Sequence, residues 1–243
     1  MNAILPWIKR TVDLVYPRNC QFCETPLAES EPGVICPACL ATTKLIEPPF
    51  CDRCALPFAG AVTGRFSCGY CKDLKFHFSR TVSACRAGGI VRDSIHRFKY
   101  NREMYYGPHL VAWLLGAATR WIDWHAVDAI VPVPLHPRKQ RAREFNQAEY
   151  LALGLSGEFK MPVLNRQLRR VKDTVTQTAL DAKGRAANLR NAFATTNAGA
   201  FAGKRLVLVD DVFTTGATLD GCAKVLRVAG AKDVVALTVA RGV

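Results

Sequence analysis

Eight of the ten cysteines fall within residues 20–71, where they form four C-x2-C pairs. A C-x2-C turn holds two thiolates about one tetrahedral edge apart, and a second such turn on a short hairpin completes a four-cysteine zinc site. Tetrahedral thiolate ligation favours zinc over iron. Four sulfur ligands leave no open coordination position, so we expect two structural Zn²⁺ sites rather than catalytic ones. The expected ligands are Cys20, Cys23, Cys36, Cys39, Cys51, Cys54, Cys68 and Cys71.

The spacing of these pairs favours two sequential ribbons, in which the first pair joins the second and the third joins the fourth. A cross-braced arrangement is the alternative. A segment this small cannot build an adequate core, so zinc is expected to supply its folding energy. Cys85 and Cys222 lie outside any C-x2-C pair, and we expect them to be small core residues.

The chain divides into three zones. Residues 1–18 predict an amphipathic helix ended by Pro17, residues 19–78 a double zinc-ribbon domain, and residues 79–243 an alternation of strands and helices. Apolar runs in the third zone predict strands at 81–86, 128–134, 163–170, near Phe193, 205–209 and 233–240. Helical spacing predicts helices at 88–100, 108–121, 144–157, 181–191 and 217–229. This alternation is typical of a doubly wound parallel α/β sheet.

The charge of the chain is strongly positive and unevenly placed. The net charge is +13, and residues 81–243 carry 24 Lys and Arg against 13 Asp and Glu, an excess of +11. A field of this sign attracts phosphate groups on nucleotides, nucleic acids or membranes, although solubility alone is the plain alternative. No run of 18 apolar residues predicts a membrane span. The N-terminus lacks the pattern of a signal peptide, so we expect a cytoplasmic protein in which disulfides are rare.

The segment LVLVDDVFTTGAT, residues 206–218, combines groups that suit a phosphorylated ribose. Its apolar strand leads into Asp210 and Asp211, whose carboxylates accept hydrogen bonds from neighbouring sugar hydroxyls. Gly216 lets the backbone approach a ligand closely, and the hydroxyl and N–H groups of the following helix start suit a phosphate. The alternative is an Asp-Asp turn with a threonine cap. The phosphate-binding set is expected to be Thr214, Thr215, Gly216, Ala217 and Thr218.

The same segment resembles the signature of type I phosphoribosyltransferases, which bind phosphoribosyl pyrophosphate (PRPP). The resemblance implies that Asp210 and Asp211 contact the ribose 2′ and 3′ hydroxyls, with Mg²⁺ bridging the PRPP hydroxyls and the pyrophosphate. It also implies that the strand end at Pro134, Leu135 and His136 forms a pyrophosphate loop.

Cations follow this strand end and recur in a later polar stretch. The run Arg138, Lys139, Arg141 and Arg143 predicts anion binding beside the pyrophosphate loop, or else a solvated helix start. In phosphoribosyltransferases a flexible loop closes over PRPP, and residues 169–191 fall at that place. From this stretch Arg170 or Lys172 could reach the pyrophosphate, while a solvated connection is the alternative.

Five segments along nearly the whole chain resemble the ComF family, also called GntX-like: PRNCQFC, FKYNRE, VPVPLHPRKQRAREFNQAEYLA, TQTALDAKGRAANLRNAF and LVLVDDVFTTGAT. The resemblance implies a cytosolic factor of natural transformation that handles single-stranded DNA, with protein partners in the uptake machinery. Within FKYNRE, Lys99 and Tyr100 have no assigned role. A surface lysine and a packed tyrosine are the plain interpretation.

Three functions remain compatible with these residues. The first is a competence protein that binds single-stranded DNA and retains a PRPP pocket. The second is an active transferase that joins PRPP to a nitrogen acceptor, and the third is a PRPP-sensing regulator. Aromatic residues near the ribbons could stack on bases or pack the ribbons together. They are Phe50, Phe58, Phe66, Tyr70, Phe76 and Phe78.

Overall fold

The computed structural model describes residues 18–62, 64, 66–173 and 191–242. Two expected helices, at 1–18 and 181–191, lie outside the described residues except for residues 18 and 191. Within the described ranges, no helix is both long enough and apolar enough to cross a membrane.

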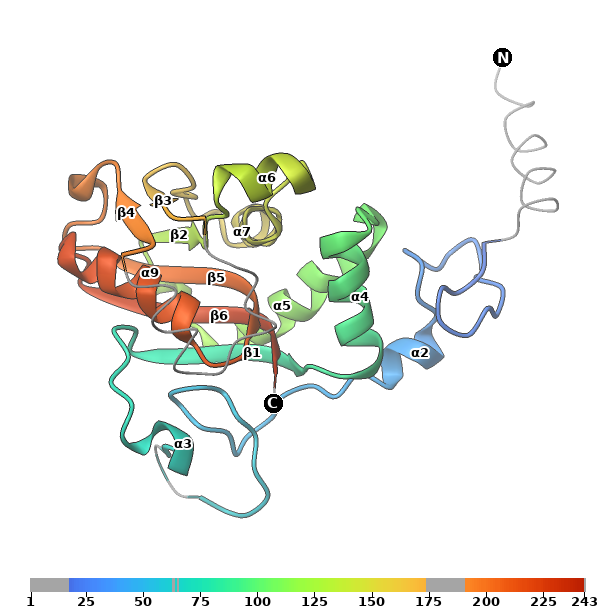
Figure 1. Ribbon diagram of the computed structural model, residues 1–243. Coiled ribbons are helices and arrows are strands. Elements are labelled where there is room, and N and C mark those ends of the chain that lie inside the picture. The colour runs from blue at the N-terminus through green and yellow to red at the C-terminus, as the bar shows by residue number, and fades with distance from the viewer. Residues whose placement is uncertain (1–17, 63, 65, 174–190, 243) are drawn as a thin grey trace.

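A parallel four-stranded sheet forms the centre of the molecule (Figure 1). Its strands are β1 (Arg80–Arg86), β2 (Ala129–Pro132), β5 (Arg205–Phe213) and β6 (Asp233–Arg241), in the order β1-β6-β5-β2. The two inner strands, β5 and β6, are largely buried. This arrangement agrees with the near-continuous apolar runs of the sequence, which are typical of parallel strands covered on both faces.

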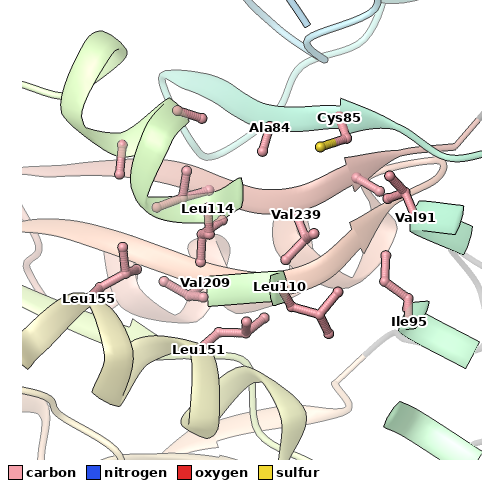
Figure 2. Packing of buried hydrophobic residues seen from close by; sticks show 14 of the residues in the cluster. Ala84, Cys85, Val91, Ile95, Leu110, Leu114, Leu151, Leu155, Val209 and Val239 are labelled. Atoms are coloured by element: carbon pink, nitrogen blue, oxygen red, sulfur yellow. The ribbon is translucent and has the colours of Figure 1, made fainter. Parts of the chain in front are cut away.

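Helices cover both faces of the sheet, so the predicted doubly wound α/β class is confirmed. One face carries α4 (Gly89–Tyr100), α5 (Gly107–Trp121) and α7 (Gln147–Phe159). Leu110, Leu114, Leu151 and Leu155 from α5 and α7 lie close to Val209 in the core that we call the α5-side cluster (Figure 2). The other face carries α9 (Ala217–Val228) in a second core, the α9-side cluster.

Several smaller elements differ from the sequence-based expectation. The expected strand at 163–170 is divided: Val163 makes one parallel bridge to Ile130, and β3 (Leu168–Arg170) pairs antiparallel with β4 (Phe193–Thr195). The helix expected from residue 144 begins at Gln147, because the Asn146 side chain accepts a hydrogen bond from the Ala148 N–H and caps it. A separate helix, α6 (Pro137–Arg143), precedes it.

Short elements complete the described chain. They are α2 (Pro37–Ala41), α3 (Gly69–Lys72) and the 3₁₀ turns η1 (Met104–Tyr106), η2 (Trp124–Ala126) and η4 (Ala198–Ala200).

The two cysteine-rich segments pack against different cores. Cys20 and Cys36 belong to the α5-side cluster, whereas Cys51 and Cys54 belong to the α9-side cluster. The segment between them runs along the edge strand β1, where the Ile46 N–H donates to the Ala84 carbonyl at 2.9 Å and the Arg86 N–H to the Lys44 carbonyl at 2.8 Å. This connection covers a sheet edge that would otherwise expose unpaired backbone groups.

Candidate functional site

The eight paired cysteines form two separate quartets, and within each quartet the sulfur atoms lie within 4.8 Å of one another. The first quartet joins the first two C-x2-C pairs and the second joins the last two, so sequential pairing is confirmed and cross-bracing is wrong. The Cys23 and Cys36 sulfurs are 3.5 Å apart, and those of Cys54 and Cys68 are 3.7 Å apart. A tetrahedron with Zn–S bonds of about 2.3 Å has an edge of about 3.8 Å. Both quartets therefore fit Zn²⁺.

Backbone N–H groups support the sulfur atoms in both quartets. The Cys36 N–H donates to the Cys20 sulfur and the Cys68 N–H to the Cys51 sulfur, each at 3.3 Å. Such bonds favour the thiolate form that binds metal. Cys85 and Cys222 lie apart from the quartets and are fully buried, as expected for core residues, and burial raises the pKa of the Cys85 thiol to about 12.

The two acids of the central motif lie within β5, which continues to Phe213 instead of ending at residue 209. Side chains alternate along a strand, so Asp210 and Asp211 project toward different faces. Asp210 lines a cavity at the start of α9, and Asp211 is paired with Lys99 at the end of α4. The adjacent acids therefore have different surroundings, although they were expected to act alike on one diol.

Lys99 is held in an ion pair with Asp211, with its Nζ atom 2.6 Å from the carboxylate Oδ2. Burial alone would lower the pKa of Lys99, but the charges of Asp211 and Asp210 outweigh it and raise that pKa. Burial would likewise raise the pKa of Asp211, yet the Lys99 ammonium holds it below its ordinary value. The interpretation of Lys99 as a plain surface lysine is wrong. Tyr100, expected to be packed, is instead 48% exposed.

Asp210 behaves differently from its neighbour. Burial and the charge of Asp211 raise the pKa of Asp210 to about 7. The pKa values of the two adjacent carboxyl groups are therefore shifted in opposite directions.

The turn from β5 into α9 forms the cavity that Asp210 lines, which is a small hollow with a volume of about 10 Å³. Gly216 stands just before the helix in the left-handed region at φ +80°. A Cβ atom there would come within 2.6 Å of the Phe213 ring and 3.2 Å of the Phe76 ring. Glycine therefore fits this position, whereas any side chain would clash. The first N–H group of α9, that of Ala217, donates to the Thr215 hydroxyl at 3.4 Å. Its lining comprises Asp210, Val212, Thr214, Thr215, Gly216, Ala217, Thr218 and Leu219.

Gly216→Ala is expected to destabilise the protein by about 2 kcal/mol or more, because the left-handed backbone and the clash with Phe213 both oppose a side chain. Urea unfolding measures the change. Gly157→Ala is the matched control: Gly157 lies in α7 with nothing within 4 Å of its added Cβ, so alanine should stabilise there. Equal stability of Gly216→Ala and the parent protein would contradict this account of the turn.

A second cavity, of about 560 Å³, lies at the end of β2. Pro134, Leu135 and His136 line it together with Arg169 and Arg170 of β3. The strand end is fixed by the Asn146 side-chain amide, which donates to the Val133 carbonyl at 3.1 Å.

The six candidate anion-binding cations divide into two groups. Burial lowers the pKa of Lys139, and the positive charges of Arg170, Arg143 and Lys99 lower it further. The Asp173 carboxylate acts in the opposite direction and raises this pKa. Lys139, Arg143 and Arg170 thus form the first group. The remaining three, Arg138, Arg141 and Lys172, are exposed.

A contact from the second ribbon to the start of α9 had no signal in the sequence. The His77 N–H donates to Asp220 Oδ1 at 2.6 Å, and the His77 ring nitrogen Nδ1 is 3.0 Å from the same oxygen. Next to it, the Phe76 ring stacks on Phe78 and meets Phe213 edge-on. The second ribbon thus braces the turn that carries Gly216.

Most aromatic residues near the ribbons pack internally. Phe50 contacts Trp121, Phe58 contacts Phe66, and Phe76 and Phe78 contact Phe213. Tyr70 is 48% exposed. Packing, rather than base stacking, therefore accounts for five of the six.

Comparison with known proteins identifies the family. The model of the double zinc ribbon domain matches residues 11–75. Competence protein F of Haemophilus influenzae is 32% identical over 222 residues, which cover 89% of this chain and 93% of that protein. The chain belongs to the ComF family. DNA utilization protein YhgH of Escherichia coli K12 is also 32% identical, over 224 residues that cover 91% of this chain and 96% of that protein.

The likeness to solved structures is weaker. Glutamine PRPP amidotransferase from B. subtilis superposes with a TM-score of 0.40 and 19% identity, over 59% of this chain and 30% of the enzyme. The family assignment rests on the curated relatives, whose full length this ComF chain nearly spans.

Proposed function

We propose that this ComF protein acts in the cytoplasm in the handling of single-stranded DNA, and that it binds PRPP at the start of α9. The observation that carries the ligand proposal is the cavity in which Asp210 faces the turn Thr214–Thr218. A carboxylate for the ribose and N–H donors for the 5′-phosphate meet there. The names of the relatives, which refer to competence and DNA utilization, support the role in DNA handling.

The two ends of PRPP differ in chemistry, and the surroundings of β5 offer partners for both. The 5′-phosphate would accept hydrogen bonds from the first turn of α9, where the helix dipole favours negative charge. The pyrophosphate would lie toward Lys139 and Arg170, which are close enough that the charge of Arg170 lowers the pKa of Lys139. Asp210 would orient the ribose, and its ionisation is favoured by a bound cation.

Mg²⁺ fits this donor set, since it prefers carboxylate and phosphate oxygens. When bound with PRPP it would neutralise the pyrophosphate charge. The chain's own part is to fix the ribose through Asp210, to hold Asp211 as an anion through Lys99, and to supply the cations.

Asp210→Asn is expected to weaken the binding of Mg-PRPP by about 10- to 100-fold, because a charge-assisted hydrogen bond contributes about 1.5–3 kcal/mol. Titration calorimetry measures the affinity. The variant should stay folded, since the pKa of Asp210, raised to about 7, already favours a neutral side chain there. Asp93→Asn is the control, because Asp93 forms a surface ion pair with exposed Arg92, away from the cavity at the start of α9.

Unchanged affinity of Asp210→Asn would refute the assigned ligand position. A screen for pyrophosphate release against nucleobases and other nitrogen acceptors then separates the remaining functions. Turnover would establish a transferase, whereas tight binding without turnover favours a binding module or a PRPP-responsive regulator.

A further inference from the structure

Helix α4 ends in an exposed aromatic cluster that the PRPP pocket does not use. Tyr100 is 48% exposed and Tyr105 is 44% exposed, whereas the adjacent Tyr106 is fully buried. His96 lies against one side of this cluster, with its ring 4.9 Å from that of Tyr100. Tyr100 is the last residue of α4 and Tyr105 lies in the following 3₁₀ turn η1, so the chain exposes two tyrosine rings where α4 ends.

A cation completes this cluster. The Arg143 guanidinium of α6 lies over the Tyr100 ring at 4.9 Å from its centroid. Aromatic rings and guanidinium planes are the two side-chain surfaces on which unpaired bases stack. His96 and Arg143 therefore both lie against Tyr100 near the surface, with the His96 ring tilted by 45° from the Tyr100 ring.

The same region carries a large excess of positive charge. Residues 89–106 and 137–144 contain eight Lys and Arg against three Asp and Glu. Each of the three acids is engaged: Asp93 with Arg92, Glu103 with Arg97, and Glu144 with Arg102. Two further acids from other segments pair with Lys99 and Arg138, whereas Arg141 lies exposed on α6. A polyanion is the ligand that such a surface attracts.

The two helix ends are joined into one platform. Arg102, just after α4, pairs with Glu144, just after α6, at 2.9 Å and donates to the Ala142 carbonyl at 3.2 Å. Both residues of this ion pair have left-handed backbone conformations, with φ +61° for Arg102 and +69° for Glu144. Non-glycine residues adopt this conformation only where their surroundings hold them in it. We call the surface formed by His96, Tyr100, Arg102, Tyr105, Arg141 and Arg143 the α4–α6 rim.

We propose that the α4–α6 rim is the surface on which this protein binds single-stranded DNA, with bases stacking on Tyr100 and Tyr105 and the backbone following the arginines. The proposal rests on the DNA-handling role proposed above and gives it a location. Tyr100 directly follows Lys99, whose ammonium pairs with Asp211. Adjacent residues of α4 thus belong to the proposed DNA surface and to the ion pair with Asp211, the neighbour of Asp210 in β5.

The test is fluorescence anisotropy with a labelled oligo(dT) of about 20 nucleotides, at about 50 mM salt and above. Tyr100→Ala combined with Tyr105→Ala is expected to weaken binding by about 10-fold or more, because each stacked base contributes about 1–3 kcal/mol. Tyr100→Phe, which keeps the ring, should bind like the parent protein. Binding should also favour the single strand over a duplex of the same sequence.

A charge variant gives an independent measurement. Arg141→Ala should reduce the slope of log affinity against log salt by about one, whereas Lys224→Ala, an exposed lysine of α9, should leave it unchanged. Equal melting temperature and zinc content of all variants establish that they are folded.

Three outcomes would contradict either the α4–α6 rim as the DNA surface or the DNA-handling role itself, and each can be told from the others. If the parent protein binds oligo(dT) and the tyrosine double variant binds equally well, the rim is not the DNA surface. If Tyr70→Ala abolishes binding instead, the second ribbon is the DNA surface, because Tyr70 is equally exposed there. If the parent protein does not bind at about 50 mM salt, the DNA-handling role itself fails.

Discussion

Removal of zinc is expected to unfold both ribbons and to lower the melting temperature of the whole chain. Structural zinc contributes about 10–16 kcal/mol of apparent binding energy in zinc-finger peptides, and here that energy is folding energy. Cys51 and Cys54 are fully buried in the α9-side cluster, next to the Phe76–Phe78 segment that braces the turn at Gly216. Loss of the second zinc should therefore disturb the ligand cavity as well as the ribbon.

The two sites should release zinc at different rates. Cys23 of the first quartet is exposed, whereas all four ligands of the second are buried. A chelator should therefore remove the first ion quickly and the second slowly, and a zinc-sensitive dye follows both phases. Circular dichroism melting reports the fold, and added Zn²⁺ should restore it. A chain that has lost both ions and melts at the original temperature would contradict this expectation.

Lys99→Met is expected to destabilise the protein by about 3 kcal/mol near neutral pH, because it leaves the Asp211 carboxylate buried without its counter-charge. Asp211 is only 5% exposed. In the parent protein the pKa of Asp211 is lowered. The ion pair therefore contributes its full stability at pH values above the ordinary Asp pKa. That stability is lost as the pH falls through the lowered pKa of Asp211. In the variant the pKa of Asp211 should rise, so its stability should fall as pH increases from about 4 toward neutrality.

Urea unfolding at about pH 5 and pH 8 measures the free energy of unfolding of the parent protein and of Lys99→Met. The stability lost in the variant should be larger at the higher pH. Lys99→Met combined with Asp211→Asn is the control, because removing both charges together should restore much of the lost stability. If the double variant is as unstable as the single one, Lys99 acts through packing and not through its charge.

Local patterns were sufficient to predict most of the fold. The apolar runs around Val131 and Val207 indicated parallel strands buried on both faces, and both lie in the sheet. Near-equal cysteine spacing favoured sequential ribbons, which the sulfur positions confirm. The boundaries were less predictable, because tertiary pairing decides them: β6 extends the ladder of β5 past the acids to Phe213.

The site was harder to predict than the fold, since its contacts join residues far apart in sequence. Lys99 and Asp211 are 112 residues apart, and His77 and Asp220 are 143 apart. No periodicity or local motif encodes such pairs. The cations of α6 show the same limit. They are neighbours in sequence, yet Lys139 is partly buried while Arg138 and Arg141 are exposed, because a helix turns successive residues to different sides.

The strand order has a consequence for biosynthesis. Strand β1 pairs with β6, and the Ser83 and Thr238 hydroxyls meet across that ladder at 2.7 Å although 155 residues separate them. During translation the ribbons emerge first and can take up zinc, while β1 has no partner strand in the four-stranded sheet until β6, the last strand of the described sheet, leaves the ribosome. A nascent chain is therefore metal-loaded at its beginning long before its sheet can close.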